Sequence, residues 1–120
     1  MSRTRILAFA SLLVFAVAPA VRASEIVSGL LVLKAGDTAD CDILNVATSP
    51  MDITVQLFES GGTALGGPTT CHGTSPDSLC GVTIIPSSTS FLFCRATVPS
   101  KKKVRATWTN DTTGAALELH

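Results

Sequence analysis

The sequence predicts an all-β fold, a small antiparallel β-sandwich of about seven strands that follows a cleaved signal peptide. Three observations carry this prediction. Apolar and polar residues alternate in short segments, as where Ile53, Val55 and Leu57 share one face and Thr54 and Gln56 the other. Turn-forming residues recur along the chain, and helical periodicity is absent after residue 23. We expect an immunoglobulin-like topology first, and a meander or an open barrel second.

The N-terminus has the three zones of a secretory signal peptide. Two arginines precede an apolar run at 6–18, and Val21 and Ala23 occupy the positions that signal peptidase reads. The run has 13 residues, fewer than the ~20 of a spanning helix, so we expect cleavage after Ala23 rather than a membrane anchor. Residues 1–23 are therefore predicted as a signal peptide. Residues 24–120 are predicted as one domain, secreted or periplasmic in a bacterium and not membrane-spanning once processed.

Seven segments of the predicted domain have the alternation and composition of strands. Clusters of glycine, proline, serine, asparagine and aspartate, residues typical of turns, separate them. In one segment Val104, Ala106 and Trp108 share a face, so Trp108 is expected in the core. The candidate strands are residues 25–33, 38–47, 51–59, 82–86, 89–98, 103–109 and 115–119.

The segment at 61–81 is too long for a tight turn and is predicted as a loop. It holds six glycines and two prolines, residues that interrupt regular structure. Ordering a long loop costs conformational entropy, and such loops are often functional. Cys71 and Cys80 lie inside it, and a bond between them would close a ten-residue ring, worth ~2.7 kcal/mol by chain entropy.

All four cysteines, Cys41, Cys71, Cys80 and Cys94, lie in the predicted exported domain, where two disulfides are the default. Zinc is the competing interpretation, but the chain has no C-x-x-C pair to form a half-site. Four cysteines leave three pairings open. In one of them Cys80 and Cys94, which are equidistant from Ser87, face each other across a hairpin and leave Cys41 for Cys71.

Four short motifs are distinctive: CDILNV at 41–46, ITV at 53–55, FCR at 93–95 and KVRA at 103–106. Together they resemble a group of small exported bacterial β-sandwich proteins of uncharacterised function. In that group a C-x-V-x-N strand stands early, and an aromatic-Cys-basic strand and a V-R-A strand stand late. The resemblance covers residues 38–109 and implies the sandwich fold and an exported location. It implies no particular function.

The same resemblance favours one disulfide pairing, Cys41 with Cys94 and Cys71 with Cys80. The first bond would close a 54-residue ring, worth ~4.2 kcal/mol by chain entropy, which is a large share of a small domain's stability. The chain departs from the group at Ile43, where the pattern has valine. The segment with Cys71 and Cys80 is an addition to the pattern.

The predicted domain is mildly acidic. After residue 23 the chain has six Lys and Arg and nine Asp and Glu, a formal charge of 6 − 9 = −3, so nucleic-acid binding is not expected. The basic residues form one cluster, Lys101, Lys102, Lys103 and Arg105. Arg95 would join it if the strands at 89–98 and 103–109 form a hairpin. The cluster could meet phosphate or acidic glycans, but we favour a solvated hairpin whose lysines oppose edge-to-edge association.

Two aromatic residues are predicted to lie outside the core. Phe91 and Phe93 alternate with Leu92 and Cys94, which take the inward face of the strand at 89–98. Phe91 and Phe93 are therefore expected to form an exposed patch, a feature that is typical of interaction surfaces.

Few residues suit catalysis or metal binding. The predicted domain has two histidines, His72 in the loop and His120 at its end, and for His72 we favour an exposed side chain over a general base. Asp37, Asp40 and Asp42 lack the glycine and distal glutamate of a calcium loop, so they are expected to be solvent-facing carboxylates. We expect no enzyme activity, no metal and no cofactor.

These observations predict an exported, non-catalytic binding or structural module of the cell envelope. Its partner would be a protein or an envelope component. The alternative is a secreted inhibitor or effector that presents the 61–81 loop to a protein target, since a stapled loop reduces the ordering cost of binding. A hydrolase that uses His72 is the third and least favoured hypothesis.

Overall fold

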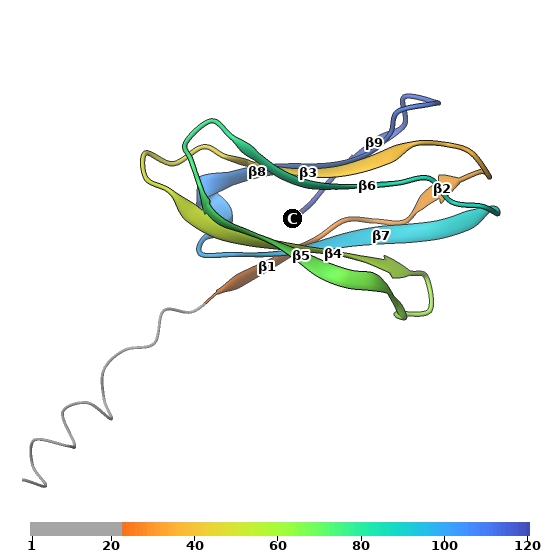
Figure 1. Cartoon of the computed structure of the whole chain (residues 1–120), viewed down its shortest axis with the longest axis horizontal. Helices are drawn as coiled ribbons and strands as arrows, with labels where there is room; N and C mark the ends of the chain where they lie inside the picture. Colours follow the sequence, from red (N-terminus) through yellow and green to blue (C-terminus); the bar gives the residue numbers. More distant parts are fainter. Residues whose placement is uncertain (1–22) are drawn as a thin grey trace, which may run out of the picture.

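The chain forms an antiparallel β-sandwich of two facing sheets, which Figure 1 shows as two layers. The structure, a computed structural model, describes residues 23–120. The predicted signal peptide, up to residue 22, lies outside the described residues. In the described part no helix is long and apolar enough to cross a membrane.

Within residues 23–120 the sandwich has nine strands and one 3₁₀ turn. Sheet A has the order β1-β7-β4-β5, with β2 also paired to β7, and sheet B has the order β6-β3-β8-β9. The strands of sheet A are β1 (Ser24–Val27), β2 (Leu31–Leu33), β4 (Met51–Glu59), β5 (Ala64–Thr74) and β7 (Ser90–Val98). Those of sheet B are β3 (Ala39–Asn45), β6 (Leu79–Ile84), β8 (Val104–Asn110) and β9 (Ala116–Glu118), and η1 (Lys101–Lys103) joins β7 to β8.

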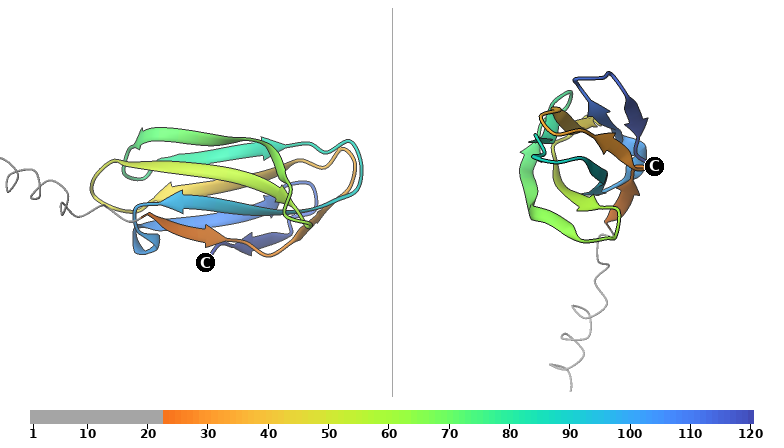
Figure 2. Two further views of the ribbon diagram at one scale, coloured as in Figure 1. Left: turned by 90° about the horizontal axis from the view of Figure 1, so that it is seen from below. Right: turned by 90° about the vertical axis from the view of Figure 1, so that its right-hand side faces the viewer.

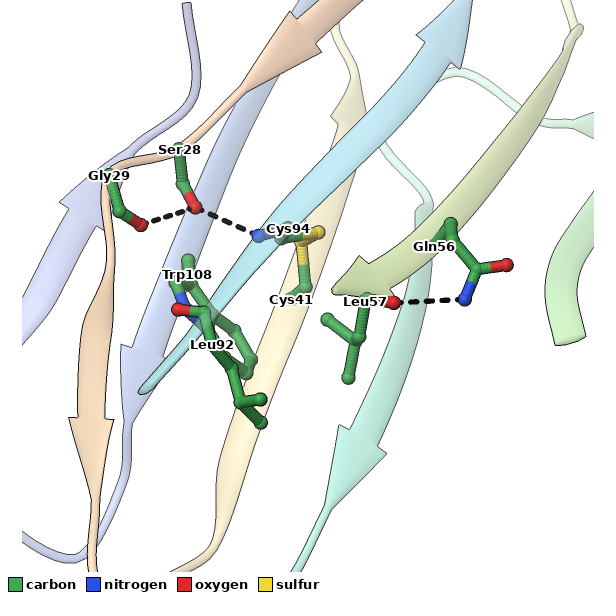
Figure 3. The surroundings of a disulfide bond; sticks show 8 residues. All are labelled: Ser28, Gly29, Cys41, Gln56, Leu57, Leu92, Cys94 and Trp108. Atoms are coloured by element: carbon green, nitrogen blue, oxygen red, sulfur yellow. Dashed lines mark hydrogen bonds between the residues drawn. A yellow bond between two sulfur atoms is a disulfide. The ribbon is translucent and has the colours of Figure 1, made fainter. Parts of the chain in front are cut away.

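The inward faces of the two sheets form one core because every central strand alternates buried with exposed or half-buried residues. Trp108 is fully buried, as predicted, and lies directly opposite Cys41 on the neighbouring strand. Its indole Nε1 donates a hydrogen bond of 3.0 Å to the Leu92 carbonyl of the other sheet. Figure 3 shows the indole beside the disulfide that joins Cys41 to Cys94.

Both disulfides connect the two sheets. Cys41 on β3 is bonded to Cys94 on β7 with a Cα–Cα distance of 6.4 Å, and Cys71 on β5 is bonded to Cys80 on β6 at 5.9 Å. The predicted pairing is confirmed. The alternative pairing of Cys80 with Cys94 is wrong, because β6 and β7 belong to different sheets and do not form the hairpin that it required. Two such bonds are typical of an oxidising, extracytoplasmic environment.

The predicted first strand at 25–33 is divided into β1 and β2 by a bulge. Residues 28–30 stand opposite only two residues of β7, so one residue is extra. Ser28 holds the bulge: its N–H donates to the Cys94 carbonyl, and its hydroxyl accepts from the Cys94 N–H and donates to the Gly29 carbonyl (Figure 3). Both halves therefore remain paired to the same strand.

The prediction of a loop at 61–81 is wrong. Most of the segment is strand: β5 pairs along β4, and β6 pairs along β3. Two of the glycines that suggested a loop lie at irregularities in the β4–β5 register. Gly66 and Gly73 adopt positive φ angles there, of 72° and 62°, which other residues rarely adopt. Pro68 is tolerated because β5 is an edge strand, whose outer side needs no N–H donor.

Outward side chains of β4 satisfy the backbone at these two irregularities. Gln56 donates from Nε2 to the carbonyls of Leu65 and Gly66, at 3.2 Å each. Asp52 accepts the N–H of Gly73 at 2.8 Å. The register of β5 is therefore fixed by specific contacts as well as by the disulfide at Cys71.

The two sides of the sandwich are closed differently. On one side Val27, at the end of β1, exchanges two backbone hydrogen bonds with His120, of 3.0 and 3.1 Å. On the other side the edge strands β5 and β6 are joined by the Cys71–Cys80 bond and share no backbone pairing in the described residues. The end-on view in Figure 2 shows the barrel-like outline that results.

Candidate functional site

The outer face of sheet A carries exposed apolar side chains. Val32 of β2 and Phe91 of β7 are directly opposite in the register, and they are 51% and 50% exposed. Directly opposed side chains of an antiparallel pair lie within contact distance. They form a continuous apolar surface at the β2 end of the sheet, as predicted for Phe91.

An aromatic and charged row adjoins this surface. Phe93 stacks on Phe58 of β4, with ring centroids 5.1 Å apart and planes inclined by 10°. The guanidinium of Arg95 lies 4.2 Å from the centre of the Phe58 ring, and its Nε is 3.2 Å from a carboxylate oxygen of Glu25. Phe93 is half-buried and Phe58 is buried by these contacts, so Phe91 is the more accessible ring. We define Val32, Phe91, Phe93 and Arg95 as the sheet A face.

The predicted basic cluster is divided. Arg95 does not lie beside Arg105, because β7 and β8 belong to different sheets and do not form a hairpin. The chain crosses between the layers through η1, which exposes Lys101, Lys102 and Lys103 at one end of the sandwich. Arg105 faces outward from sheet B and donates from Nη1 to the Val104 carbonyl.

A shallow groove of about 470 Å³ lies beside the divided cluster. Its lining combines Lys101 and Arg105 with Glu118, His120 and the apolar Ile26. The Glu118 carboxylate in the same lining opposes the binding of a simple anion. The groove therefore does not support the disfavoured alternative of a phosphate or glycan site.

The outer face of sheet B carries a row of carboxylates. A hydrogen bond shared with Asp111, and a second from the Thr83 hydroxyl, hold the pKa of Asp40 below its ordinary value, while the shared bond raises the pKa of Asp111. Burial, and then the charge of Asp40, raise the pKa of Asp42. Asp42 leans over Gly81 on β6, where any Cβ would meet its carboxylate. The absence of a side chain at Gly81 thus makes room for Asp42.

Asp37 does not join this row. It is buried in the turn before β3, where it accepts hydrogen bonds from the Asn110 side chain and from the Lys34 N–H, both of 2.9 Å. These bonds hold the pKa of Asp37 below its ordinary value. Among the described residues, no three His, Cys, Asp or Glu side chains are placed to hold a metal ion.

We expect Asp42→Asn to stabilise the protein at neutral pH. Because the pKa of Asp42 is raised in the folded state, folding favours the protonated carboxyl, and that contribution is lost as the pH rises above about 3.8. The uncharged amide avoids this loss. The melting temperature of the variant should exceed that of the wild type at pH 7, and the two should converge near pH 3. Glu59→Gln is the control for removal of one surface charge, and an equal gain there would contradict the argument.

His72 is exposed and lies beside an acid that the sequence did not single out. Its Nδ1 is 3.7 Å from a carboxylate oxygen of Asp52, and the two side chains are 81% and 68% exposed. The distance exceeds that of a hydrogen bond. Asp52 is engaged with the Gly73 N–H, so the pair lies on the β4–β5 surface with water on its other sides.

The asparagine of the CDILNV motif is structural. Asn45 is fully buried; its amide donates to the carbonyls of Ser49 and Thr74, and its oxygen accepts the Ala47 N–H. It therefore ties the β3–β4 connection to the end of β5. Asn45 thus belongs to the framework rather than to a surface site.

Sequence reasoning missed Val32 of the sheet A face, and also Phe58 and Glu25, which contact Phe93 and Arg95 of that face. They come from three strands, and only the register places them beside Phe91, Phe93 and Arg95. One signal was available for Phe58, which alternation placed on the polar face of its strand with Thr54 and Gln56. An aromatic side chain on such a face indicates a surface cluster.

Comparison with known proteins gives one distant structural similarity. No family model matches the chain, and no curated protein matches it. A solved structure of FlgD from P. aeruginosa is similar over 85% of this chain and 74% of that chain, with a TM-score of 0.39 and 12% identity. A similarity this weak carries no argument about function.

Proposed function

We propose that the protein is an exported, non-catalytic binding or structural module of the cell envelope, secreted or periplasmic, whose partner is a protein or an envelope component. The observation that carries the proposal is the exposed pair Val32 and Phe91 on the sheet A face. Exposed apolar surface of this kind marks interaction sites. Two disulfides between the sheets and the predicted signal peptide support the location.

The sheet A face has the makeup of a protein interaction surface. Aromatic rings and arginine are enriched where binding energy concentrates, and charged rims surround such centres. Here Phe91 and Phe93 lie beside Arg95, whose guanidinium is already oriented by Glu25 and Phe58. A guanidinium held in place loses less side-chain entropy when a partner binds.

Phe91→Ser should reduce capture of the partner from envelope extracts by at least about tenfold, since truncation of a hot-spot aromatic residue costs about 2 kcal/mol or more. Capture on the immobilised exported protein is measured by quantitative mass spectrometry. Val46→Ser is the matched control. Val46 is also exposed, at 40%, but it lies after β3 at the end of sheet B. Equal capture by the wild type and by Phe91→Ser would remove the sheet A face from the proposal.

The alternative function, a secreted inhibitor or effector presenting residues 61–81, loses its original basis because this segment is strand rather than loop. Its remaining support is the exposed, disulfide-stapled surface of β5. Thr70→Glu on that surface separates the two functions, because Thr70 is exposed and lies opposite the outward-facing Thr54. Loss of capture in Thr70→Glu with normal capture in Phe91→Ser would favour the inhibitor or effector.

His72→Ala should leave stability and biological activity nearly unchanged. The exposed pair with Asp52 contributes little, as solvent-exposed ion pairs generally do. General acid–base chemistry would need a third group that the pair can act on, held in place away from bulk water. Thermal unfolding and a panel of hydrolase substrates test this prediction. A turnover that is present in the wild type and absent from a folded His72→Ala variant would make the protein an enzyme.

The immunoglobulin-like topology also remains a proposal. Its support is the core arrangement, in which an inter-sheet disulfide packs beside a buried tryptophan, as in immunoglobulin domains. The strand order argues for a variant of that topology, since β1 lies beside β7 and not beside β3.

A further inference from the structure

The open side of the sandwich, between β5 and β6, has an unpaired main-chain edge. In the described residues β6 pairs with β3 alone, and β5 with β4 alone. The opposite side is closed by the backbone bonds between Val27 and His120 and by the Asn110 amide, which donates to the Val32 carbonyl at 3.4 Å. In the described residues β5 and β6 are joined to each other by the Cys71–Cys80 bond rather than by backbone hydrogen bonds.

The free edge of β6 presents regular hydrogen-bonding groups. Its register with β3 is continuous, and Asn45 donates its N–H to the Ser78 carbonyl just before the strand begins. Alternate residues of an antiparallel pair are hydrogen-bonded, so residues 80, 82 and 84 direct their backbone groups to β3. Gly81 and Thr83 therefore direct their N–H and C=O groups to the free edge.

This edge lacks the features that protect strands from pairing. The six residues of β6 contain no charge and no proline, and the strand has no bulge. β5, in contrast, is interrupted at Gly66 and Gly73 and contains Pro68, which has no N–H to donate. Of the two edges on the open side, β6 is thus the one able to accept another strand.

A groove of mixed lining, in which apolar side chains lie beside Thr69 and Thr83, runs along the same edge. It has a volume of about 360 Å³ and lies between β5 and β6. We call this groove the seam. Its floor includes Val55 and Leu57 of the core, and its walls include Leu65, Val82 and Ile84. Val82 and Ile84 are half-buried rather than buried because the seam is open. A strand added to β6 would direct every second side chain into the seam.

The other face of such a strand would meet the carboxylate row. Residues opposite Gly81 and Thr83 would point outward, on the same side as Asp42 and Asp40. Gly81 has no side chain to separate them from Asp42, which leans across it. Basic side chains at these positions would be attracted to the row, and acidic ones repelled.

We propose that β6 is a strand-addition site for an extended segment of another polypeptide that alternates apolar with lysine or arginine residues. The apolar side chains fill the seam, the backbone pairs with Gly81 and Thr83, and the basic side chains face Asp40 and Asp42. This mode of recognition takes its affinity from main-chain hydrogen bonds and its specificity from alternate side chains. The site is distinct from the sheet A face.

The charges on sheet B disfavour a second copy of the chain as the occupant. Antiparallel pairing of β6 with β6 of another copy would place the two carboxylate rows, each with Asp40 and Asp42, on one continuous face. Like charges placed close together across an interface oppose association. A basic segment would instead be attracted to the carboxylate row, which favours its binding.

The test uses a fluorescein-labelled, eight-residue peptide that alternates lysine and valine, titrated into the exported, disulfide-bonded protein and followed by anisotropy. We expect saturable binding that Thr83→Pro weakens about tenfold or more, because proline removes an N–H at the free edge. Asp42→Asn should weaken it about threefold. Phe91→Ser should leave the affinity for the peptide unchanged, because Phe91 lies on the sheet A face. The peptide titration therefore tests the β6 site separately from the proposed function.

Two matched peptides make the test independent of whether Thr83→Pro folds. Backbone N-methylation of the lysines removes the donors that face Gly81 and Thr83 and should abolish binding, while N-methylation of the valines removes donors that face away from β6 and should preserve it. A peptide alternating glutamate and valine should fail to bind. Equal affinity for the glutamate peptide or the lysine-methylated peptide would overturn the proposal. A dimer in sedimentation that Thr83→Pro dissociates would also overturn it and would assign the edge to a second copy.

Discussion

Replacing both Cys41 and Cys94 with alanine should lower the free energy of unfolding by about 4 kcal/mol. The bond closes a ring of 54 residues, counting both cysteines, and its loss frees the unfolded chain to adopt many more conformations. Both cysteines are fully buried, so the alanines replace the bond without exposing new polar groups. Urea denaturation followed by tryptophan fluorescence measures the change, since Trp108 lies opposite Cys41.

The matched control is the double alanine variant at Cys71 and Cys80. This bond closes a ring of ten residues, and the same chain-entropy argument gives a loss of ~2.7 kcal/mol. The order of the two effects is the decisive result. A larger loss from the Cys71–Cys80 pair would show that the chain-entropy account fails for this fold, and that the bond at the open side contributes more than its ring size indicates.

Trp108→Ala should destabilise the protein by about 3–5 kcal/mol, the usual cost of truncating a buried aromatic residue. The indole is fully buried and packs beside the Cys41–Cys94 bond (Figure 3). Its removal leaves a cavity and also leaves the Leu92 carbonyl without its hydrogen-bond donor. Because this loss approaches the whole stability of a small domain, the variant is best measured by its soluble yield and its melting temperature.

Trp108→Phe separates packing from hydrogen bonding. The smaller ring retains much of the apolar contact but cannot donate to Leu92, so about 1–3 kcal/mol should be lost. The difference between the two variants then measures the packing of the aromatic ring. A loss below about 1 kcal/mol in Trp108→Ala would contradict the central position of the indole in the core.

Alternation in the sequence predicted the central strands well. β3, β4, β7 and β8 each lie within two residues of their predicted bounds, because one face of each is buried against the other sheet and the period of two is strict. The same pattern placed Trp108 inside and Phe91 outside, both correctly. Both predictions succeeded because alternation along a strand follows directly from which of its faces is buried.

The edges could not be predicted in this way. Most residues of β5 are exposed, and the strand contains four glycines or prolines, so its composition resembles that of a loop. Its strand form depends on contacts with Gln56 and Asp52 and on the pairing with β4. The split of the first strand depends on the Ser28 bulge. Both features are tertiary, since the contacts that stabilise them come from distant parts of the chain.

The surface was predictable only one strand at a time. The outward position of Phe93 followed from alternation, but its stacking on Phe58 depends on the pairing of β4 with β7. The grouping of Arg95 with Arg105 failed because a connection of five residues, 99–103, can form a hairpin or cross between sheets. In this structure the connection contains η1 and crosses from sheet A to sheet B.

The most direct test of the binding function is photo-crosslinking in the living host. A photoreactive phenylalanine analogue replaces Phe91 in one strain and Val46 in another, since both side chains are exposed but Phe91 alone lies on the sheet A face. We predict that irradiation yields a crosslinked species of higher mass from position 91 and none from position 46. Crosslinking from neither position, or equally from both, would contradict a specific partner at the sheet A face.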